Sequence, residues 1–352
     1  MIDDIEIQEI DTLIATAKEA QAEYEADGSQ EVFDLACQAV GWALMQPENN
    51  NELSELAVME TGLGNVRDKI QKNHNKTLGL LRDIKNVKSF GHIYDDNEKG
   101  LSIYFRPKGV VAAIVPSTNP LATPTNNIIN ALKTGNSIII APSPKGAGPF
   151  SILLKHIRKN LEDVGINPNL VQMVPTPPSK SKTKRLMELA DLLVVTGSQN
   201  NVRAGYSSGT PALGVGQGNV VTILDETADL NDAAKKIVKS KTFDNATSCS
   251  SENSVIAVRS IYKETLVALE SAGGLVLDED ETKRVINLHW QDGKMNTALL
   301  AQNIDVILDK TGLAHRADEN TRFLILPTTK VGPSAVISGE KMSQFLSLYM
   351  AE

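Results

Sequence analysis

Between residues 109 and 206 the sequence alternates short, wholly apolar segments with longer amphipathic ones. The apolar segments are GVVAAIV, SIIIAP, LVQMV and LLVVTG, and each is followed by a stretch with helical periodicity. Strands that lack a polar face must be covered on both sides, and a helix after every strand lets the next strand join in parallel. The pattern therefore predicts an α/β fold with a doubly wound, mostly parallel sheet.

Helical periodicity also characterises the first 87 residues. Apolar residues recur at intervals of three and four in IDTLIATAKEAQAEYEA and EVFDLACQAVGWALMQ. Cys37 lies in the second of these stripes, and a free cysteine at such a position is expected to pack in the core. After these helices, LSIYFRPKGVVAAIV predicts two strands separated at residues 106–109.

A second α/β unit is predicted further along the chain. LNDAAKKIVKSKTFDN reads as a helix, SVIAV as a strand and IYKETLVALESAGG as another helix. A chain of 352 residues is long enough for two cores. We therefore expect a dinucleotide-binding domain with N-terminal helices over residues 1–228 and a catalytic domain over 229–352. A cofactor site is expected in the cleft between them.

Charge and composition exclude several classes of partner. The 35 Lys and Arg residues are outnumbered by 43 Asp and Glu, which gives a net charge of -8 and no positive field for nucleic acid or an anionic membrane. No apolar run reaches the length of a membrane span, and the acidic start does not resemble a signal peptide. Two cysteines are too few for a disulfide framework, so we expect a cytoplasmic protein. The five histidines have no paired spacing, so no metal site is predicted.

Cys249 lies in an unusual setting. Its segment, TFDNATSCSSENSV, surrounds the thiol with small and hydroxyl-bearing residues and joins a predicted helix to a predicted strand. Such a loop has little to bury, so its sulfur is expected to be exposed near backbone N–H groups, which favours the thiolate. The alternative is a buried thiol with a packing role.

Polar residues follow the first long strand, in the segment PSTNP. Pro116 ends the strand, and Ser117, Thr118 and Asn119 lie at its carboxyl end, where doubly wound sheets bind ligands. The Asn119 amide can donate to a developing oxyanion. Alternatively, it satisfies the backbone of its own loop.

Two glycine-containing segments are candidates for cofactor contact. Thr196, Gly197 and Ser198 join a strand to the start of a helix, where backbone N–H groups can bind a pyrophosphate. GVGQGN, which begins at Gly214, has alternate glycines but lacks the following helix of a dinucleotide fingerprint. We interpret it as backbone packed closely against another group, with a plain turn as the alternative.

Taken together and in order, five segments resemble the aldehyde dehydrogenase superfamily. They are VRDKIQKNH, GVVAAIVPSTNP, LKTGNSIIIAPSPK, TGSQNNVRAGYSSGTPALGVGQGN and SKTFDNATSCSSENSV. The resemblance is to the CoA-acylating branch, which includes the aldehyde dehydrogenase half of bifunctional aldehyde-alcohol dehydrogenases. It implies that Cys249 attacks the aldehyde, that Asn119 and the cysteine's own N–H hold the oxyanion, and that a nicotinamide cofactor takes the hydride. An enzyme thioester is then left.

The fate of that thioester separates the branches of the superfamily. Hydrolytic relatives carry a Glu before a pair of glycines, whereas ALGVGQGN has Val215 there and no carboxylate from Pro211 to Asn219. General-base help is commonly worth roughly 10²- to 10⁴-fold, so without it the thioester survives until CoA arrives. Acyl-CoA is the implied product, and hydrolysis to a free acid is the disfavoured alternative.

The resemblance also implies a cofactor site and a small aldehyde of undetermined identity. Many NAD-preferring relatives have an acid after the second strand, but here Ser143, Pro144 and Lys145 follow it, so both NAD and NADP remain open. Glu340 matches a family residue that approaches the nicotinamide ribose. The residues assigned to the cofactor are Pro116, Ser117, Thr118, Ser143, Pro144, Lys145, Thr196, Gly197, Ser198, Gly214, Val215, Gly216 and Glu340.

Family members continue well past the segment GEKMSQFLSLYMAE. We therefore expect a C-terminally shortened homologue with uncovered apolar surface at a sheet edge, a loosely held Glu340, weak dinucleotide binding and little turnover. The full family form is expected to be a homo-oligomer. A catalytically impaired homologue acting as a binding or structural subunit is the alternative, against which the retained Cys249 and Asn119 argue.

Overall fold

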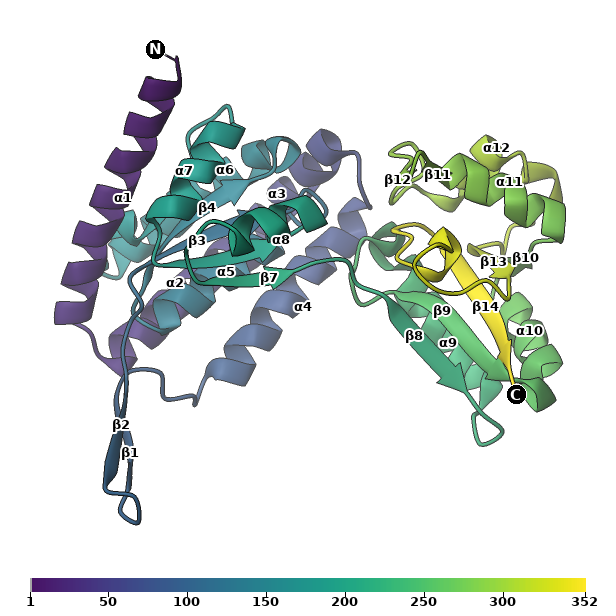
Figure 1. Ribbon diagram of the computed structural model, residues 1–352, viewed down its shortest axis with the longest axis horizontal. Helices are drawn as coiled ribbons and strands as arrows, with labels where there is room; N and C mark the ends of the chain where they lie inside the picture. The colour runs from purple at the N-terminus through teal and green to yellow at the C-terminus, as the bar shows by residue number, and fades with distance from the viewer. Residues whose placement is uncertain (1) are drawn as a thin grey trace. The chain divides into compact units, whose positions relative to one another are not determined.

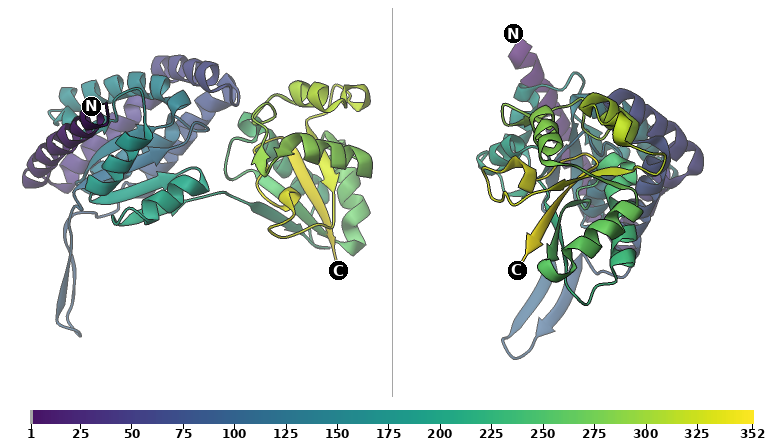
Figure 2. Two further views of the ribbon diagram at one scale, coloured as in Figure 1. Left: turned by 45° about the horizontal axis from the view of Figure 1, so that its top comes forward. Right: turned by 90° about the vertical axis from the view of Figure 1, so that its right-hand side faces the viewer.

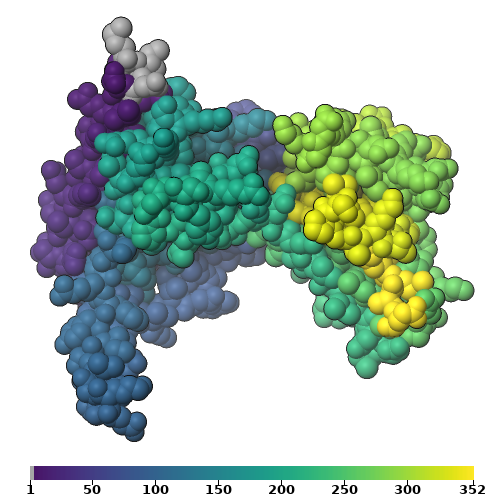
Figure 3. Space-filling view, in the orientation of Figure 1, coloured from purple at the N-terminus to yellow at the C-terminus, as the bar shows by residue number. Residues whose placement is uncertain are grey.

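The computed structural model describes residues 2–352, with side chains from residue 4 onward. The chain forms two compact units, coloured from purple to yellow along the chain in Figure 1, Figure 2 and Figure 3. Unit 1 comprises Met1–Thr61 and Lys69–Gly216, and unit 2 comprises Gly62–Asp68 and Gln217–Glu352. The division into a dinucleotide-binding domain and a catalytic domain at residue 228 stays a prediction.

Unit 1 is built on a five-stranded sheet in the order β5-β4-β3-β6-β7, with every neighbouring pair parallel. The strands are β3 (Val110–Val115), β4 (Ser137–Pro142), β5 (Val171–Met173), β6 (Leu192–Thr196) and β7 (Ala212–Val215). All residues of β3 and β4 are buried, which explains why these two strands show no polar alternation. The doubly wound sheet predicted from the alternation is confirmed.

Helices cover both faces of this sheet (Figure 1). They are α1 (Ile2–Ala26), α2 (Gln30–Met45), α3 (Pro47–Thr61), α4 (Val66–Ile84), α5 (Ala122–Lys133), α6 (Ala147–Asp163), α7 (Lys180–Leu189) and α8 (Gln199–Tyr206). Alternate residues of β3 enter two different cores: Val111 packs with α2, α5 and α6, and Val110 packs with α1 and α7. Within α2, Cys37 is only 2% exposed, and burial raises the pKa of its thiol to about 12. The packing role expected for Cys37 is confirmed.

An antiparallel hairpin of β1 (Gly91–Asp96) and β2 (Leu101–Phe105) precedes β3. Figure 2 shows it projecting from the helices and sheet of unit 1. Residues 106–109 separate β2 from β3, as the sequence predicted. Among the described residues, the helices do not include one long and apolar enough to cross a bilayer.

Unit 2 is built on a second parallel sheet, in the order β10-β13-β14-β9-β8. Its strands are β8 (Val220–Leu224), β9 (Glu252–Val258), β10 (Gly274–Val276), β13 (Phe323–Pro327) and β14 (Phe345–Ala351). A separate two-stranded sheet, β11 (Trp290–Gln291) with β12 (Lys294–Met295), lies between β10 and β13 in the sequence. The helices are α9 (Leu230–Thr242), α10 (Tyr262–Ser271), α11 (Glu279–His289) and α12 (Ile304–Thr311). One core holds α9 and α10 against the sheet, and a second holds α11 and α12.

Strand β14 corrects one expectation. Glu340 was expected to be loosely held, but the strand that follows it, β14, pairs with β13 on one side and β9 on the other. A central strand is fixed by two hydrogen-bonded ladders. The two edges of the sheet are β10 and β8, and on β8 Val221 is 44% and Ile223 71% exposed.

Candidate active site

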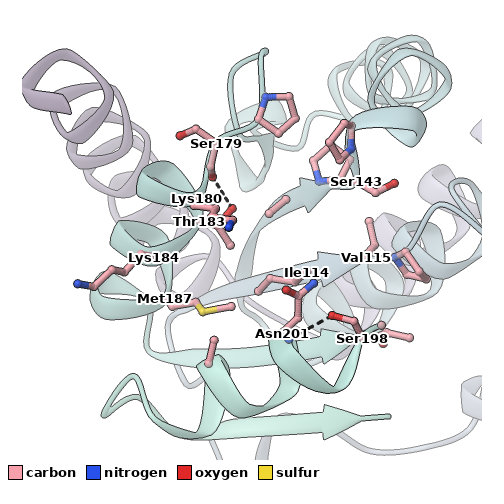
Figure 4. A pocket seen from close by; sticks show the side chains of 18 of the residues that line it. Ile114, Val115, Ser143, Ser179, Lys180, Thr183, Lys184, Met187, Ser198 and Asn201 are labelled. Atoms are coloured by element: carbon pink, nitrogen blue, oxygen red, sulfur yellow. Dashed lines mark hydrogen bonds between the residues drawn. The ribbon is translucent and has the colours of Figure 1, made fainter. Parts of the chain in front are cut away.

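A cavity of about 830 Å³ opens in unit 1 at the carboxyl ends of β3, β4 and β6 (Figure 4). Seven of the residues assigned to the cofactor line it: Pro116, Ser117, Ser143, Pro144, Thr196, Gly197 and Ser198. The remaining walls come from α7 and α8. Parallel strands place their carboxyl ends at one edge, and this edge is where doubly wound sheets bind ligands.

The turn from β6 into α8 forms one wall of the cavity. Gly197 has a φ of 151°, a conformation that favours glycine, and Ser198 caps α8 by accepting the N–H of Asn201 at 3.3 Å. The N–H of Gly197 itself donates to the Val215 carbonyl at 3.3 Å. The sheet therefore already uses this N–H, and the contact predicted between Gly197 and a pyrophosphate stays a prediction. The start of α8 still directs the positive end of a helix dipole to this wall.

Ser143 supplies a second wall where β4 ends. Its Oγ is buried and makes no hydrogen bond within residues 4–352. A buried hydroxyl without a partner is costly, so a polar group of a bound ligand would satisfy it. The volume and this hydroxyl fit a dinucleotide. Lys145, by contrast, is exposed in the short helix Pro144–Gly146 and does not line the cavity.

The contribution of α7 to the wall of the cavity was not predicted from the sequence. Ser179, Lys180, Thr183 and Glu188 line the cavity, and Ser179 caps the helix by accepting the N–H of Lys182 at 3.1 Å. In Figure 4 the side chain of Lys184 extends away from the other lining side chains. The run SKSKTKR was the available signal, because it puts a capping serine and several cations at a helix start.

Asn119 is half-buried in the loop between β3 and α5 and does not line this cavity. Its amide makes no hydrogen bond to any described residue. The loop backbone therefore does not use it, and the amide is available to a ligand. Thr118 also lies outside the lining of the cavity.

Cys249 belongs to unit 2, in the loop between α9 and β9. Its thiol is exposed, as the small flanking residues predicted, whereas Cys37 is buried. The N–H of Cys249 makes no hydrogen bond to the described chain, so it can donate to an oxyanion. The role of Cys249 as a nucleophile stays a prediction.

Two residues of unit 2 pack around this loop. Gly218 follows β7, and a Cβ on it would lie 2.9 Å from the Cys249 carbonyl oxygen. The half-buried Glu340 accepts the N–H of Gly218; burial raises the pKa of its carboxyl, and the charge of Lys241 together with this hydrogen bond opposes the rise. The structure thus places both Glu340 and the Cys249 loop beside Gly218, within one unit. The close backbone approach predicted for GVGQGN is confirmed.

The other residues of GVGQGN lie on or just after the edge strand β7 and do not line the cavity. Gly214 donates its N–H to the Tyr206 hydroxyl at 3.1 Å, and a Cβ on Gly216 would lie 2.1 Å from Gln199 Nε2. Val215 is 57% exposed. Cofactor contact by Gly214, Val215 and Gly216 stays a prediction.

A group of buried bases near Glu340 was not foreseen. Lys241, Lys341 and His289 are each 0% exposed. Burial lowers the pKa of Lys241 to about 7, that of Lys341 to about 6 and that of His289 to about 4. Lys341 Nζ donates to the carbonyls of Asn253 at 2.8 Å and Gly339 at 3.0 Å. Within residues 4–352, no group of acids, histidines and cysteines has the arrangement of a metal site.

Comparison with known proteins identifies the family. The model of the "Aldehyde dehydrogenase family" matches residues 2–274, and the chain belongs to this family. A sulfoacetaldehyde dehydrogenase (acylating) of Cupriavidus necator is 49% identical over 96% of this chain and 69% of its own length. The resemblance inferred from the five segments is confirmed.

Solved structures agree with the fold. An acetylating aldehyde dehydrogenase from Geobacillus thermoglucosidasius matches with a TM-score of 0.93 and 32% identity, over 100% of this chain and 77% of that one. A propionaldehyde dehydrogenase of Rhodopseudomonas palustris, with bound CoA and an acylated cysteine, matches with a TM-score of 0.84 and 27% identity, over 97% of this chain and 77% of that one. The α/β fold class is confirmed.

Proposed function

We propose that this chain catalyses the reversible conversion of an aldehyde, CoA and NAD(P)+ into an acyl-CoA and NAD(P)H through a thioester on Cys249. The relatives that are named acylating or acetylating enzymes support this reaction and an oxidoreductase class. The observation that carries the proposal is an exposed cysteine with an unused N–H on a loop that contacts Gly218 and, through it, Glu340. A non-catalytic binding subunit is disfavoured because both predicted catalytic side chains are retained.

Each residue has a defined task in this proposal. The Cys249 thiolate adds to the aldehyde carbonyl, and the Cys249 N–H with the Asn119 amide stabilises the oxyanion, each contact lowering the barrier by roughly 3 kcal/mol. Ser143, Thr196 and Ser198 would hold the nicotinamide dinucleotide, which accepts a hydride when bound. Departure of the hydride leaves the acyl group on sulfur as a thioester.

The release of the acyl group is assigned to CoA. Hydrolysis would need a base to activate water, and the exposed Val215 lies where hydrolytic relatives have a carboxylate. The CoA thiol releases its proton to solvent, its thiolate attacks the thioester carbonyl and replaces the sulfur of Cys249, and Cys249 leaves as the thiolate that begins the next cycle. The bound CoA and acylated cysteine of the Rhodopseudomonas palustris enzyme support this assignment.

We propose an aldehyde with an anionic substituent. Sulfoacetaldehyde dehydrogenases of Cupriavidus necator and Bilophila wadsworthia and a succinate-semialdehyde dehydrogenase (acetylating) of Clostridium kluyveri support this class, at 49%, 39% and 36% identity. Sulfonate and carboxylate groups each add a negative charge to a small aldehyde. The proposal includes both NAD and NADP as cofactors, and a solved structure of an engineered glycolyl-CoA reductase with bound NADP+ supports NADP.

An NAD(P)H absorbance assay tests the proposal. Sulfoacetaldehyde and succinate semialdehyde are compared with acetaldehyde and propionaldehyde, with and without CoA. We expect CoA-dependent reduction of the cofactor, faster with the anionic aldehydes, and a product with the mass of an acyl-CoA. Formation of a free acid at the same rate without CoA would refute the acylating assignment.

We also propose a homo-oligomeric form and a cytoplasmic location. The exposed Val221 and Ile223 on edge strand β8 support the first, because an apolar sheet edge favours association. The small number of cysteines supports the second. Sedimentation velocity between micromolar and submicromolar concentrations tests the first, and a single monomeric species throughout would contradict it.

A further inference from the structure

The residues that lead into the Cys249 loop have a rare backbone conformation. Asp244, Asn245 and Ala246 follow one another with φ values of 48°, 53° and 64°. Only glycine and, less readily, Asn and Asp adopt this left-handed region without strain. Three such residues in succession, one of them an alanine, persist only where the surroundings determine the conformation.

Hydrogen bonds to Asp244 determine this conformation. The Asp244 side chain is 0% exposed; its Oδ1 accepts the N–H of Asn65 at 2.9 Å, and its Oδ2 accepts the Thr247 hydroxyl at 2.5 Å. Its own N–H donates to Asp68 Oδ2 at 2.8 Å. Asp68 and Asn65 are in turn joined to each other, because Asn65 Nδ2 donates to Asp68 Oδ2 at 2.8 Å. A carboxylate in the loop is thus fixed by the segment Gly62–Asp68 of the same unit.

Two more residues with positive φ belong to the same hydrogen-bonded cluster. Asn245 Nδ2 donates to the carbonyl of Ala301 at 3.2 Å, and Ala301, with a φ of 52°, donates its N–H to the carbonyl of Met342 at 2.9 Å. Met342 has a φ of 45° and lies two residues after Glu340. Asp292 is the one other non-glycine residue with positive φ within residues 2–352. The strained positions are therefore concentrated between the Cys249 loop and the segment that carries Glu340.

We propose that Asp244 is a positioning residue of the active site, whose carboxylate fixes the left-handed loop and thereby the place of the Cys249 thiol and N–H. This inference rests on the proposed function of Cys249. It is consistent with the pattern that backbone strain collects at functional sites, where it holds a group in place before the substrate arrives. Asp244 does not touch the substrate in this proposal; it acts through Thr247 and the loop that follows.

The test measures the reactivity of Cys249 separately from turnover. The rate of Cys249 alkylation by iodoacetamide at pH 7 is followed by mass spectrometry of its peptide in folded protein. Asp244→Asn keeps one acceptor oxygen for the Asn65 N–H but removes the negative charge and the oxygen that accepts the Thr247 hydroxyl, so the loop and the N–H groups that favour thiolate are held less firmly. We expect alkylation to slow at least about fivefold, and kcat to fall at least about tenfold with the KM for NAD(P)+ within about twofold.

Asp278→Ala is the matched control. Asp278 is also an aspartate of unit 2 that accepts a backbone N–H, that of Glu281 at 2.8 Å, and it caps α11. Its loss should lower the melting temperature and leave the alkylation rate of Cys249 unchanged. Slower alkylation in Asp244→Asn alone supports the proposal. Equal effects of the two variants, or unchanged alkylation in folded Asp244→Asn, would overturn it.

A second variant keeps the test decisive if Asp244→Asn does not fold. Thr247→Val preserves the shape of the side chain and removes the hydroxyl that donates to Asp244 Oδ2. We expect it to fold and to slow alkylation at least about twofold; an unchanged rate would count against the proposal. Turnover that survives in Cys249→Ala would instead refute the proposed function, without altering what these alkylation rates say about the loop.

Discussion

The backbone of Gly218 packs directly against the carbonyl of Cys249. A Cβ on Gly218 would lie 2.9 Å from that oxygen, closer than side chains tolerate, and the same glycine donates its N–H to Glu340. Gly218 therefore contacts both the cysteine loop and the carboxylate assigned to the nicotinamide ribose.

Gly218→Ala should displace the Cys249 loop. Overpacking in well-ordered structure costs about 1–3 kcal/mol, and here the strain falls on the catalytic loop, so we expect kcat to fall at least about tenfold. Gly79→Ala is the control, because an added Cβ at Gly79 in α4 meets nothing within 4 Å. Steady-state kinetics and circular dichroism of both variants make the comparison. Full activity in folded Gly218→Ala would show that the contact is not needed.

The two thiols should differ in reactivity and in function. Cys249 is exposed, whereas burial raises the pKa of the Cys37 thiol to about 12. A thiol must ionise to react with iodoacetamide, so in native protein we expect label on Cys249 and almost none on Cys37 until urea unfolds unit 1. Cys249→Ala should abolish turnover and Cys37→Ala should retain it. Turnover in Cys249→Ala would refute the assignment of the nucleophile.

The buried Lys241 predicts how stability depends on pH. Burial lowers its pKa from 10.5 to about 7, with Glu252 and Glu340 opposing the fall. Between these two values the unfolded chain binds the additional proton, so this residue makes the free energy of unfolding increase as the pH rises from about 7 to 10.5. Below about pH 7 the full cost of burying the charged Lys241 is present in the free energy of unfolding.

Lys241→Met should remove that dependence. Replacing a buried charge with an apolar side chain of similar size is often neutral or stabilising by about 1–4 kcal/mol, and we expect stabilisation at pH 7 that shrinks towards pH 10. Glu340 loses a favourable charge in this variant, which reduces the gain. The groups that face Lys241 are Glu252, Glu340, Lys341 and His289. Urea unfolding at pH 7, 8.5 and 10 measures the difference, and a difference that does not change with pH would contradict the explanation.

Lys180 should contribute to the choice between the two nicotinamide cofactors. It lines the cavity of unit 1 from the first turn of α7, where its charge and the helix dipole both favour an additional phosphate. We expect dissociation constants for NADPH and NADH within about tenfold, and Lys180→Met should weaken NADPH about three- to tenfold with little effect on NADH. Fluorescence titration of both cofactors provides the values. Equal losses of affinity for NADPH and NADH would show that Lys180 contacts a part that the two cofactors share.

Edge strand β8 should promote self-association. Ile223 is 71% exposed on this strand, and a charged residue at an edge discourages pairing with another chain. Ile223→Lys should therefore shift the sedimentation profile towards smaller species without loss of helix content. Lys235→Ile on the exposed surface of α9 is a control for general hydrophobicity. An unchanged profile in Ile223→Lys would exclude this edge from the contact.

The features that depend only on neighbouring residues, namely the doubly wound sheet and the exposed loop, could be predicted from the sequence. The wholly apolar strands β3 and β4 and the helix after each required a doubly wound sheet, and the small residues around Cys249 indicated an exposed loop. The hydrogen bonds that fix the Cys249 loop could not be predicted from the sequence, because the one from Asn65 to Asp244 joins residues separated by 179 positions. Lys241 was also unpredictable, since a lysine in an amphipathic helix normally reaches solvent. The availability of the Gly197 N–H depended on a pairing with β7 that no motif reveals.

The membership of Gly62–Asp68 in unit 2 has a consequence for synthesis. These residues are made after Met1–Thr61 and before Lys69–Gly216 of unit 1, yet the carboxylate that fixes the Asn65 N–H belongs to a residue 179 positions later. At about 5–20 residues per second, that delay is on the order of ten seconds or more, during which the helices on either side can already form. The Cys249 loop consequently cannot reach its final geometry until long after Gly62–Asp68 has been made, and a nascent chain released before Asp244 has no means of assembling it.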